Sequence, residues 1–342
     1  MPRAALPPGK LPHRLLASLL KELPSADGVV LGPGVGRDVA VIEAGDGGDR
    51  LWLATSDPIT FATDRVGRYA VTVSVNDIAA AGGVPRFFLA TILLPEGETT
   101  EEAVRAIFDE IAAACREFGV GWIGGHTEVT LGLDRVVVAG TMLGEVARAD
   151  LVRSDGGRPG DVVICAGEVP LEGGALLASG CAEALGAAGL GGDALAELSG
   201  LLDVPGLCVL PAARALCDAV RPHAMHDPTE GGIATALWEL AEVAGIGIRV
   251  DADAIPWHPL AARAARALGL DPLGLIASGA LLAAVAPEDE APALAALASA
   301  GVPANTIATL VPEAAGRVLV EAGRERPLPV FASDEIARAF SG

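Results

Sequence analysis

Acidic side chains follow or close apolar segments at three places in the sequence, where they could bind a metal ion. Asp57 comes shortly after the apolar run 51–55, and Asp77 closes a segment rich in valine and alanine. Glu128 follows a pair of glycines. Mg²⁺ prefers oxygen ligands and is usually bound by one or two carboxylates together with phosphates. These carboxylates therefore predict a magnesium site.

A glycine-containing stretch upstream, Gly34-Val35-Gly36-Arg37-Asp38, is the candidate phosphate-binding loop. Because glycine has no side chain, the backbone N–H groups at Gly34 and Gly36 can approach a phosphate closely. Asp38 adds another carboxylate at the end of this loop.

Each of these features also has a purely structural explanation. Asp57 precedes a proline, so its backbone is extended, and a lone aspartate there is also explained as a turn cap. Asn76 and Asp77 lie among apolar neighbours near the end of a predicted helix, where a buried aspartate needs a partner or a cation.

The stretch Gly124-Gly125-His126-Thr127-Glu128 follows a short predicted strand, and its two glycines predict a tight turn. Thr127 and Glu128 offer hydroxyl and carboxylate oxygens. His126 fits a core histidine, a base or a ligand equally well.

A second candidate site precedes a helix in the other half of the chain, over residues 226–232. Asp227 as N-cap, Pro228 at the first position and Glu230 three residues on match a capping box. The capping box leaves Gly231 and Gly232 unexplained, since each glycine costs about 1 kcal/mol relative to alanine inside a helix. Close approach of a substrate, or an anion at the helix N-terminus, would explain them.

Alternating short strands and amphipathic helices must position these residues. In the first half we predict helices at 11–23, 66–81 and 100–118, and strands at 39–43, 51–55, 86–94, 122–123 and 135–146. In the second half we predict helices at 172–185, 211–220, 231–244 and 292–300, and strands at 161–167, 246–250, 281–285, 307–310 and 317–320. We expect no core pattern in 323–342.

The turn-rich stretch Ser154–Gly160 is the best domain boundary. We therefore predict an α/β (α+β) protein of two domains, 1–153 for ATP and Mg²⁺ binding and dimerisation, and 154–342 as the second domain.

Composition excludes several classes of function. The formal net charge of −20 argues against nucleic-acid binding, which depends on basic patches. The five cysteines have no paired spacing, which is typical of reduced thiols in a cytoplasmic protein. The first residues do not resemble a signal peptide, and the uncharged run 272–287 is too short to span a membrane. Neither a P-loop nor a dinucleotide fingerprint is present.

Taken together, the motifs resemble those of the AIR synthase-like (PurM-like) superfamily. The resemblance rests on Gly36-Arg37-Asp38, Thr55-Ser56-Asp57, Asn76-Asp77-Ile78-Ala79, Gly124-Gly125-His126-Thr127 and Asp227-Pro228-Thr229-Glu230-Gly231-Gly232, and it spans residues 32–320. Within the superfamily the chain looks most like the hydrogenase expression/formation (HypE) branch, whose corresponding helix start is Asp-Pro-Thr-x-Gly-Gly.

The resemblance implies an N-terminal domain that forms a homodimer by joining sheets, and a cofactor set of ATP and Mg²⁺. Carried over by position, Asp38, Asp57 and Asp77 bind metal or phosphate, with Asn76 beside them. Members typically use ATP to phosphorylate an oxygen of a small substrate.

This chain departs from the branch in two ways. The family usually has aspartate where this sequence has His126, so Glu128 is the candidate replacement ligand. The branch also carries a C-terminal Pro-Arg-x-Cys tail, whereas no cysteine follows Cys217 here.

The leading hypothesis is an ATP- and Mg²⁺-dependent phosphoryl-transfer or ligase-type enzyme acting on a small molecule. His126, His226 and Asp227 are the candidate catalytic residues, and Gly124, Gly125, Thr127, Gly231 and Gly232 are candidate nucleotide contacts. The alternatives are a non-catalytic nucleotide-binding partner in maturation or assembly, with its own maturation partner protein, and a kinase like thiamine-monophosphate kinase.

Overall fold

The computed structural model describes residues 6, 9–45, 47–61 and 65–340 and divides them into two compact units. The smaller unit contains 25–32 and 38–151. The larger unit contains the described residues before Ser25, the loop Pro33–Arg37 and the chain from Val152 onward. Because the chain passes between them more than once, each unit is discontinuous in sequence.

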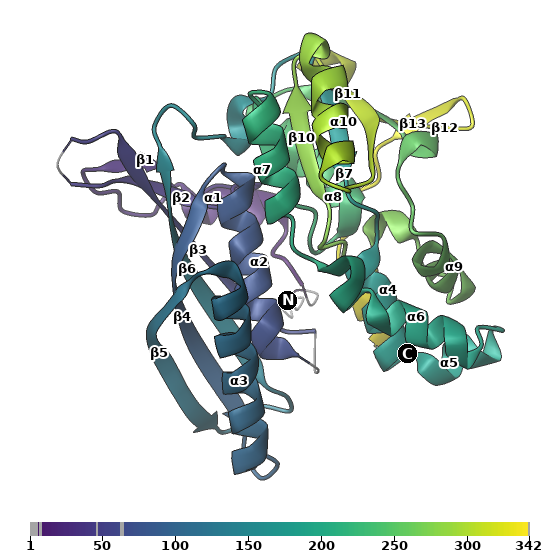
Figure 1. Ribbon diagram of the computed structural model, residues 1–342. Helices are drawn as coiled ribbons and strands as arrows, with labels where there is room; N and C mark the ends of the chain where they lie inside the picture. The colour runs from purple at the N-terminus through teal and green to yellow at the C-terminus, as the bar shows by residue number, and fades with distance from the viewer. Residues whose placement is uncertain (1–5, 7–8, 46, 62–64, 341–342) are drawn as a thin grey trace, which may run out of the picture. The chain divides into compact units, whose positions relative to one another are not determined.

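The smaller unit is a six-stranded sheet with two helices (Figure 1). The strand order is β1-β2-β3-β6-β4-β5, antiparallel except for the parallel pair β4–β5. The elements are β1 (Val29–Leu31), β2 (Ala40–Glu43), β3 (Arg50–Ile59), α2 (Val66–Ala80), β4 (Val84–Pro95), α3 (Glu101–Phe118), β5 (Gly121–Thr130) and β6 (Val137–Ala147).

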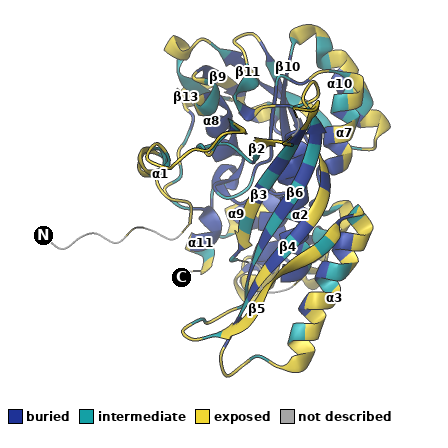
Figure 2. Ribbon diagram, turned by 90° about the vertical axis from the view of Figure 1, so that its left-hand side faces the viewer, coloured by how far each residue is buried: buried dark blue, intermediate teal, exposed yellow. Residues whose placement is uncertain are grey.

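Helix α2 is the core element of this unit and is buried over most of its length, in contrast to the mostly exposed strand β5 (Figure 2). It packs on β3, β4 and β6 on one side and on α3 on the other, so even its polar residues are buried. Glycines on β6 permit this close packing, because a Cβ at Gly144 would lie 2.4 Å from Ile78 and one at Gly140 would lie 2.9 Å from the Ala70 carbonyl oxygen. The placement of α2 brings Asn76 and Asp77 into the interior.

The larger unit contains a seven-stranded sheet in the order β13-β12-β9-β11-β7-β10-β8. Its strands are β7 (Val162–Ala166), β8 (Ala224–His226), β9 (Gly247–Asp251), β10 (Leu281–Val285), β11 (Ala304–Val311), β12 (Arg317–Glu321) and β13 (Arg324–Pro327). Its helices are α1 (His13–Leu20), α4 (Leu171–Gly180), α5 (Ala182–Ala187), α6 (Gly192–Gly200), α7 (Leu210–Ala219), α8 (Gly232–Ala244), α9 (Pro259–Ala267), α10 (Glu290–Ser299) and α11 (Glu335–Phe340).

Helix α8 forms the main core of the larger unit with one face of this sheet. Val163 and Cys165 of β7 belong to that core together with Leu237 of α8. The intervening Ile164 is also fully buried, so β7 is covered on both faces and carries a continuous apolar run. Helices α4, α6 and α9 form a separate group, with α11 against α4 (Figure 1).

The structure corrects the expected tight turn at Gly124-Gly125. Both glycines lie inside β5, which continues from Gly121 to Thr130. Gly125 has a φ of 141°, and a Cβ there would lie 1.8 Å from the carbonyl oxygen of Ala90. The glycine is therefore needed for the close approach of β4 and β5.

Strand β3 is longer than predicted and includes Asp57 and Pro58. At this end β3 pairs with β6 only, because β2 pairs with residues 51–54. On the side of β3 that faces β2, Pro58 has no neighbouring strand, so its missing N–H costs no hydrogen bond there.

Other differences concern the second half. The helix expected at 172–185 is two helices, α4 and α5, and the stretch around 190–202 contains α6. The final stretch is also part of the core, since Ile336 of α11 is fully buried. Its apolar residues are too few to form a visible pattern without the rest of the unit.

One helical stretch, Gly192–Ala219, is long and apolar enough to cross a membrane by length and composition alone. The stretch is interrupted by Val204, whose backbone is not helical. Of its most apolar 18 residues, 39% are buried inside the protein. A single such stretch is weak evidence for a membrane span.

Candidate active-site residues

Two of the predicted metal ligands meet in the smaller unit. Thr55 and Asp57 are two residues apart on β3 and therefore share a face of the strand, and Asp77 lies in the last turns of α2. The Thr55 hydroxyl is 3.0 Å from Asp57 Oδ2 and 2.5 Å from Asp77 Oδ2. A hydroxyl has one hydrogen to donate, so it satisfies one carboxylate at a time. The pair favours a cation, which would neutralise both charges.

The neighbouring predicted ligands belong to the same unit. Asn76 is fully buried beside Asp77, and Asp38 is partly buried two residues before β2. Thr55 was named only as part of the Thr55-Ser56-Asp57 motif and was given no role. The signal that could have assigned it one is a polar residue two positions before Asp57 on the same strand.

The glycine loop belongs to the larger unit. Gly36 has a φ of 71°, and a Cβ there would lie 3.1 Å from Cβ of Glu239 on α8. A tight contact with α8 therefore also accounts for this glycine. Gly34 closes a turn in which its carbonyl accepts from the Arg37 N–H.

The residues of β5 lie apart from the aspartate pair. His126 Nε2 is 3.1 Å from Glu128 Oε2, and both side chains are exposed. Thr130 donates to Glu128, and this hydrogen bond, followed by the one from His126, lowers the pKa of Glu128. Thr127 is exposed as well, on the alternate face of the strand.

The sheet register locates the β5 residues relative to β3. His126 pairs with Thr91, which pairs with Ala139, which pairs with Pro58. Three strand spacings amount to about 14 Å. Within one chain, Glu128 is therefore too distant to replace a missing ligand beside Asp57 and Asp77, which corrects the expectation of a shared site.

In the larger unit, His226 is held by a buried carboxylate that the sequence did not suggest. His226 Nε2 is 3.1 Å from Glu239 Oε2, and both side chains are 5% exposed. Glu239 also meets Lys10 Nζ at 3.6 Å and His13 Nε2 at 3.3 Å. Burial opposes its ionisation, but these groups outweigh burial and hold the pKa of Glu239 well below its ordinary range.

The predicted capping box at the start of α8 is wrong. The N-cap is Gly231, with a φ of 83°, and Asp227 lies four residues earlier with 1% exposure. The Gly231 N–H instead donates to Asp334 Oδ2 at 2.6 Å. A Cβ at Gly232 would lie 2.5 Å from the Leu273 carbonyl oxygen, so approach of the protein's own backbone explains this glycine.

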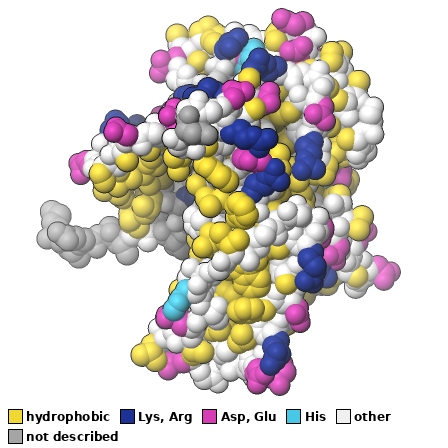
Figure 3. All heavy atoms as spheres, turned by 60° about the vertical axis from the view of Figure 1, so that its left-hand side comes forward, with side chains coloured by type: hydrophobic (Ala, Val, Ile, Leu, Met, Phe, Trp, Pro, Cys, Tyr) yellow, Lys and Arg dark blue, Asp and Glu magenta, His cyan; other side chains and the backbone are white. Residues whose placement is uncertain are grey.

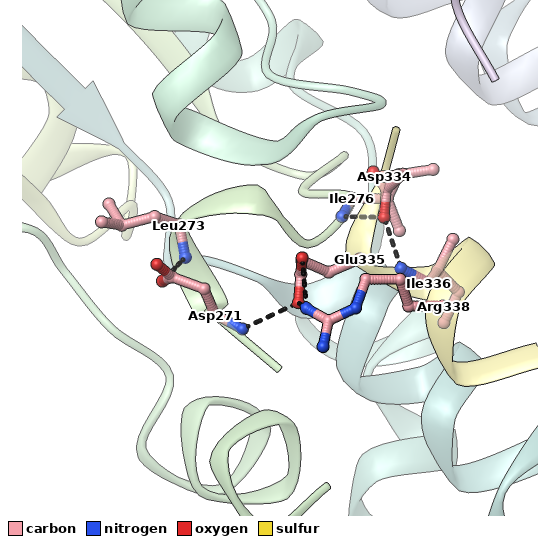
Figure 4. A network of polar contacts seen from close by, with 7 residues as sticks. All are labelled: Asp271, Leu273, Ile276, Asp334, Glu335, Ile336 and Arg338. Carbon is pink, nitrogen blue, oxygen red and sulfur yellow. Dashed lines mark hydrogen bonds and ion pairs between the residues drawn. The ribbon is translucent and has the colours of Figure 1, made fainter. Parts of the chain in front are cut away.

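Asp334 is a second residue that the prediction missed. Its Oδ1 accepts from the N–H of Ile276 at 3.2 Å and of Ile336 at 2.7 Å (Figure 4). Burial raises the pKa of Asp334 to about 6 even though these N–H groups and that of Gly231 favour its charged form. Nearby, Glu335 pairs with Arg338 and accepts from the Asp271 N–H (Figure 4).

Family models and individual relatives match most of the chain. Residues 36–146 match the N-terminal domain of AIR synthase related protein, and residues 158–321 match its C-terminal domain. The chain belongs to the AIR synthase-related family. Carbamoyl dehydratase HypE of Rhizobium leguminosarum bv. viciae is 35% identical over 256 residues, covering 73% of this chain and 70% of that protein. Carbamoyl dehydratase HypE of Rhodobacter capsulatus is 30% identical, covering 90% of each chain.

Several solved structures share the fold. HypE in complex with ATP superposes with a TM-score of 0.69 at 24% identity, covering 92% of this chain and 89% of that one. A HypE–HypF complex gives a TM-score of 0.70 at 23% identity, covering 87% and 94%. ThiL with AMPPCP and TMP gives 0.67 at 19% identity, covering 91% and 92%.

These comparisons confirm the predicted family and the predicted two-domain AIR synthase-like fold. They also confirm the predicted relation to HypE, since curated HypE proteins are 30–35% identical to this chain. The roles of the individual site residues stay predictions.

Proposed function

We propose that this member of the AIR synthase-related family uses ATP and Mg²⁺ to phosphorylate or activate an oxygen of a small substrate. The observation that carries the proposal is the Asp57–Thr55–Asp77 cluster, two carboxylates that share one hydroxyl. Phosphoryl transfer depends mainly on positioning and on neutralising charge, which metal ions at such carboxylates supply. Asp38 and Asn76 complete the proposed ligand set in the smaller unit.

Proton transfer in this proposal falls to His226, which forms a buried pair with Glu239 beside Asp227. The predicted alternative, His126 with Glu128, is an exposed pair three strands away from Asp57 within one chain. An imidazole oriented by a carboxylate is a common arrangement for general acid–base catalysis. The glycines at 34, 36, 124, 125, 231 and 232, with Thr127, are the proposed nucleotide contacts.

The names of the relatives support one choice of substrate within this proposal. Because two of them are named carbamoyl dehydratases, the proposed substrate feature is an amide oxygen that becomes a leaving group. Another relative is named as a putative hydrogenase expression/formation protein, which supports a proposed role in hydrogenase maturation in the cytoplasm. By analogy with the HypE–HypF complex, the chain would then receive its substrate from a maturation partner protein.

The substrate is proposed to come from outside the chain rather than to be carried on a cysteine. Burial raises the pKa of Cys115 to about 11 and of Cys165 to about 12, and it raises the pKa of Cys181 as well. Thiols of this kind are poor nucleophiles at neutral pH.

Intact-mass analysis tests this part of the proposal. After incubation with carbamoyl phosphate, ATP and a carbamoyl-transferring partner, the protein should carry no adduct. A stable carbamoyl or cyano adduct would contradict it.

A homodimer through the smaller unit is also proposed, with β5 as the pairing strand. Strands β4 and β6 have partners on both sides, whereas β5 is an edge of the sheet. Ile123 and Val129 of β5 are 56% and 59% exposed, and Figure 3 shows hydrophobic side chains on this part of the surface. An exposed apolar edge favours pairing with a second copy.

Light scattering tests the dimer. The wild-type protein should have a dimeric mass, and Val129→Lys should reduce it. A monomeric wild-type mass at micromolar concentration would contradict the proposal.

Calorimetry with ATP, with and without Mg²⁺, tests the main proposal. Wild-type protein should bind ATP at least about tenfold more tightly with Mg²⁺, because the carboxylates otherwise repel the phosphates. Asp57→Asn should remove this dependence and leave apo stability unchanged or higher, since one of two like charges is gone. Asp134→Asn, an exposed carboxylate of the same unit, is the control. Equal affinity with and without Mg²⁺ would overturn the proposal.

Turnover separates the proposed enzyme from its alternatives. A nucleotide-binding assembly subunit would bind Mg²⁺–ATP without releasing ADP in the presence of any acceptor. A small-molecule kinase would transfer the phosphate to a product that retains it, whereas a dehydratase would release both ADP and phosphate.

A further inference from the structure

The carboxyl group of Glu172 lies at a junction of four segments in the larger unit. It is in the first turn of α4, where Gly173 donates its N–H to the Ile276 carbonyl at 3.0 Å. A Cβ at Gly173 would lie 2.4 Å from Leu275, so α4 and the segment 275–278 are in direct contact. Asp334 joins the same segment to Gly231 and to α11.

One oxygen of Glu172 is left without a partner at this junction. The residue is 6% exposed, and Ser278 donates to its carboxyl group from the hydroxyl and from the backbone N–H. Oε2, in contrast, has no hydrogen-bond partner among the described residues. An unsatisfied buried oxygen of this kind costs about 1–3 kcal/mol, so its persistence calls for a ligand that supplies the missing donor.

The charges around Oε2 restrict the chemistry of that ligand. Asp334 and Glu230 are close enough to disfavour a negative charge on Glu172, and burial is the larger contribution to a pKa raised to about 7. An anion such as phosphate is therefore excluded, although α4 begins here. Both oxygens of Asp334 already accept backbone N–H groups, which leaves too few free oxygens for a metal ion. A group that donates N–H bonds fits both restrictions.

We propose that Glu172 Oε2 binds a hydrogen-bond-donating nitrogen of the small-molecule substrate, such as an amine, amidine or carboxamide NH₂. The proposal rests on the proposed function for the assumption that a small substrate is bound, and it names the polar end of that substrate. Ser278 holds the carboxyl group in a fixed orientation, while Glu230 adds a favourable charge for a cationic nitrogen.

The test uses the full chain without nucleotide or Mg²⁺ and compares two small cations as probes. Methylammonium carries N–H donors, whereas tetramethylammonium has the same charge and none. At pH 8, equal ionic strength and a concentration several times its Kd, methylammonium should raise the Tm by about 2–4 °C more than tetramethylammonium does. Broadening of the methylammonium NMR signal by the protein gives a second, direct measurement of binding.

Matched variants assign the effect to Glu172. Glu172→Gln should abolish the difference between the two cations, because the amide presents a donor in place of the free oxygen. Glu172→Asp keeps the charge, but its shorter side chain moves the carboxylate oxygen away from the ligand. This variant should also show equal Tm shifts for the two cations. Glu335→Gln changes another buried carboxylate of the same unit, one whose oxygens are already paired, and it should keep the difference.

Equal Tm shifts for the two cations in the wild type, or a difference that survives in Glu172→Gln or Glu172→Asp, would overturn the inference. Because no nucleotide is present, failure of Mg²⁺-dependent ATP binding would not alter this result, and the two proposals fail separately.

Discussion

The two units handle carboxylates in opposite ways. In the smaller unit, Asp57 and Asp77 face each other across the single hydroxyl of Thr55. In the larger unit, buried Glu239 is surrounded by Lys10, His13 and His226, and Asp334 accepts three backbone N–H groups. The larger unit therefore surrounds these carboxylates with basic groups and N–H donors, whereas the smaller unit brings two carboxylates to one hydroxyl, where we propose that a cation binds. Glu172 is the exception in the larger unit.

The largest expected effect is that of replacing Glu239, the carboxylate that contacts Lys10, His13 and His226 in the larger unit. Glu239→Gln should destabilise the protein by about 3–5 kcal/mol, because buried His226 loses its carboxylate partner, as do the more exposed Lys10 and His13. It should also release the segment around Lys10 and His13 to proteolysis. Urea unfolding measures the loss. Glu242→Gln, on the exposed side of α8, is the control and should cost less than about 1 kcal/mol.

A smaller effect, of opposite sign, is expected for Glu172→Gln. Burial raises the pKa of Glu172 from 4.5 to about 7, so the folded state binds the proton more tightly than the unfolded state does. The stability that the protonated Glu172 gives the folded state is fully present below pH 4.5 and is lost as the pH rises to about 7. At pH 8 the variant should be more stable than wild type by up to about 3 kcal/mol, with no difference near pH 4. A variant less stable at pH 8 would contradict this.

Thr55→Val should destabilise the smaller unit by leaving Asp57 and Asp77 without the hydroxyl that they share. The substitution keeps the shape of the side chain and removes the donor that the two aspartates share, which should cost about 1–3 kcal/mol without divalent cations. Added Mg²⁺ should recover part of this loss, because it supplies the missing positive charge. Thermal unfolding with and without Mg²⁺ measures both effects; Ser56→Ala, whose exposed hydroxyl meets Thr141, serves as the control.

The smallest effect is expected for an exposed ion pair. Arg105 and Glu101 are one turn apart on α3, and both side chains are 73% exposed. Arg105→Ala should change the free energy of unfolding by less than about 0.5 kcal/mol, because water and salt screen the pair. A loss of more than about 1 kcal/mol in the free energy of unfolding would show that exposed ion pairs stabilise this protein more than expected.

Local signals predicted those elements whose cause is local. Helix α3 begins after Thr100, whose hydroxyl accepts from the Ala103 N–H at 3.2 Å, and it ends at Gly119 in the left-handed conformation. Strand β10 has the predicted bounds, 281–285. In both cases neighbouring residues supply the cap, the stop or the apolar run.

The motifs that placed the chain in its family were also readable from the sequence, because they depend on residue type and order alone. What the glycines do in three dimensions was not readable. Gly125 was predicted as a turn residue, but it lies in β5 against the backbone of β4. The predicted capping box left Gly231 unexplained, and the group that its N–H contacts, Asp334, lies 103 residues away.

Tertiary structure alone decided which carboxylates have partners. Asp57 and Asp77 were predicted to act together, but the hydroxyl between them belongs to Thr55, and the sheet register separates Glu128 from them. In the sequence, Glu239 appears as an ordinary helix residue, and Glu172 is marked only by its place at a helix start before two glycines. Their properties come from burial and from groups brought together across the sheet and helices, because an ionisable group responds to the charges and donors around it in space and not to its neighbours in the chain.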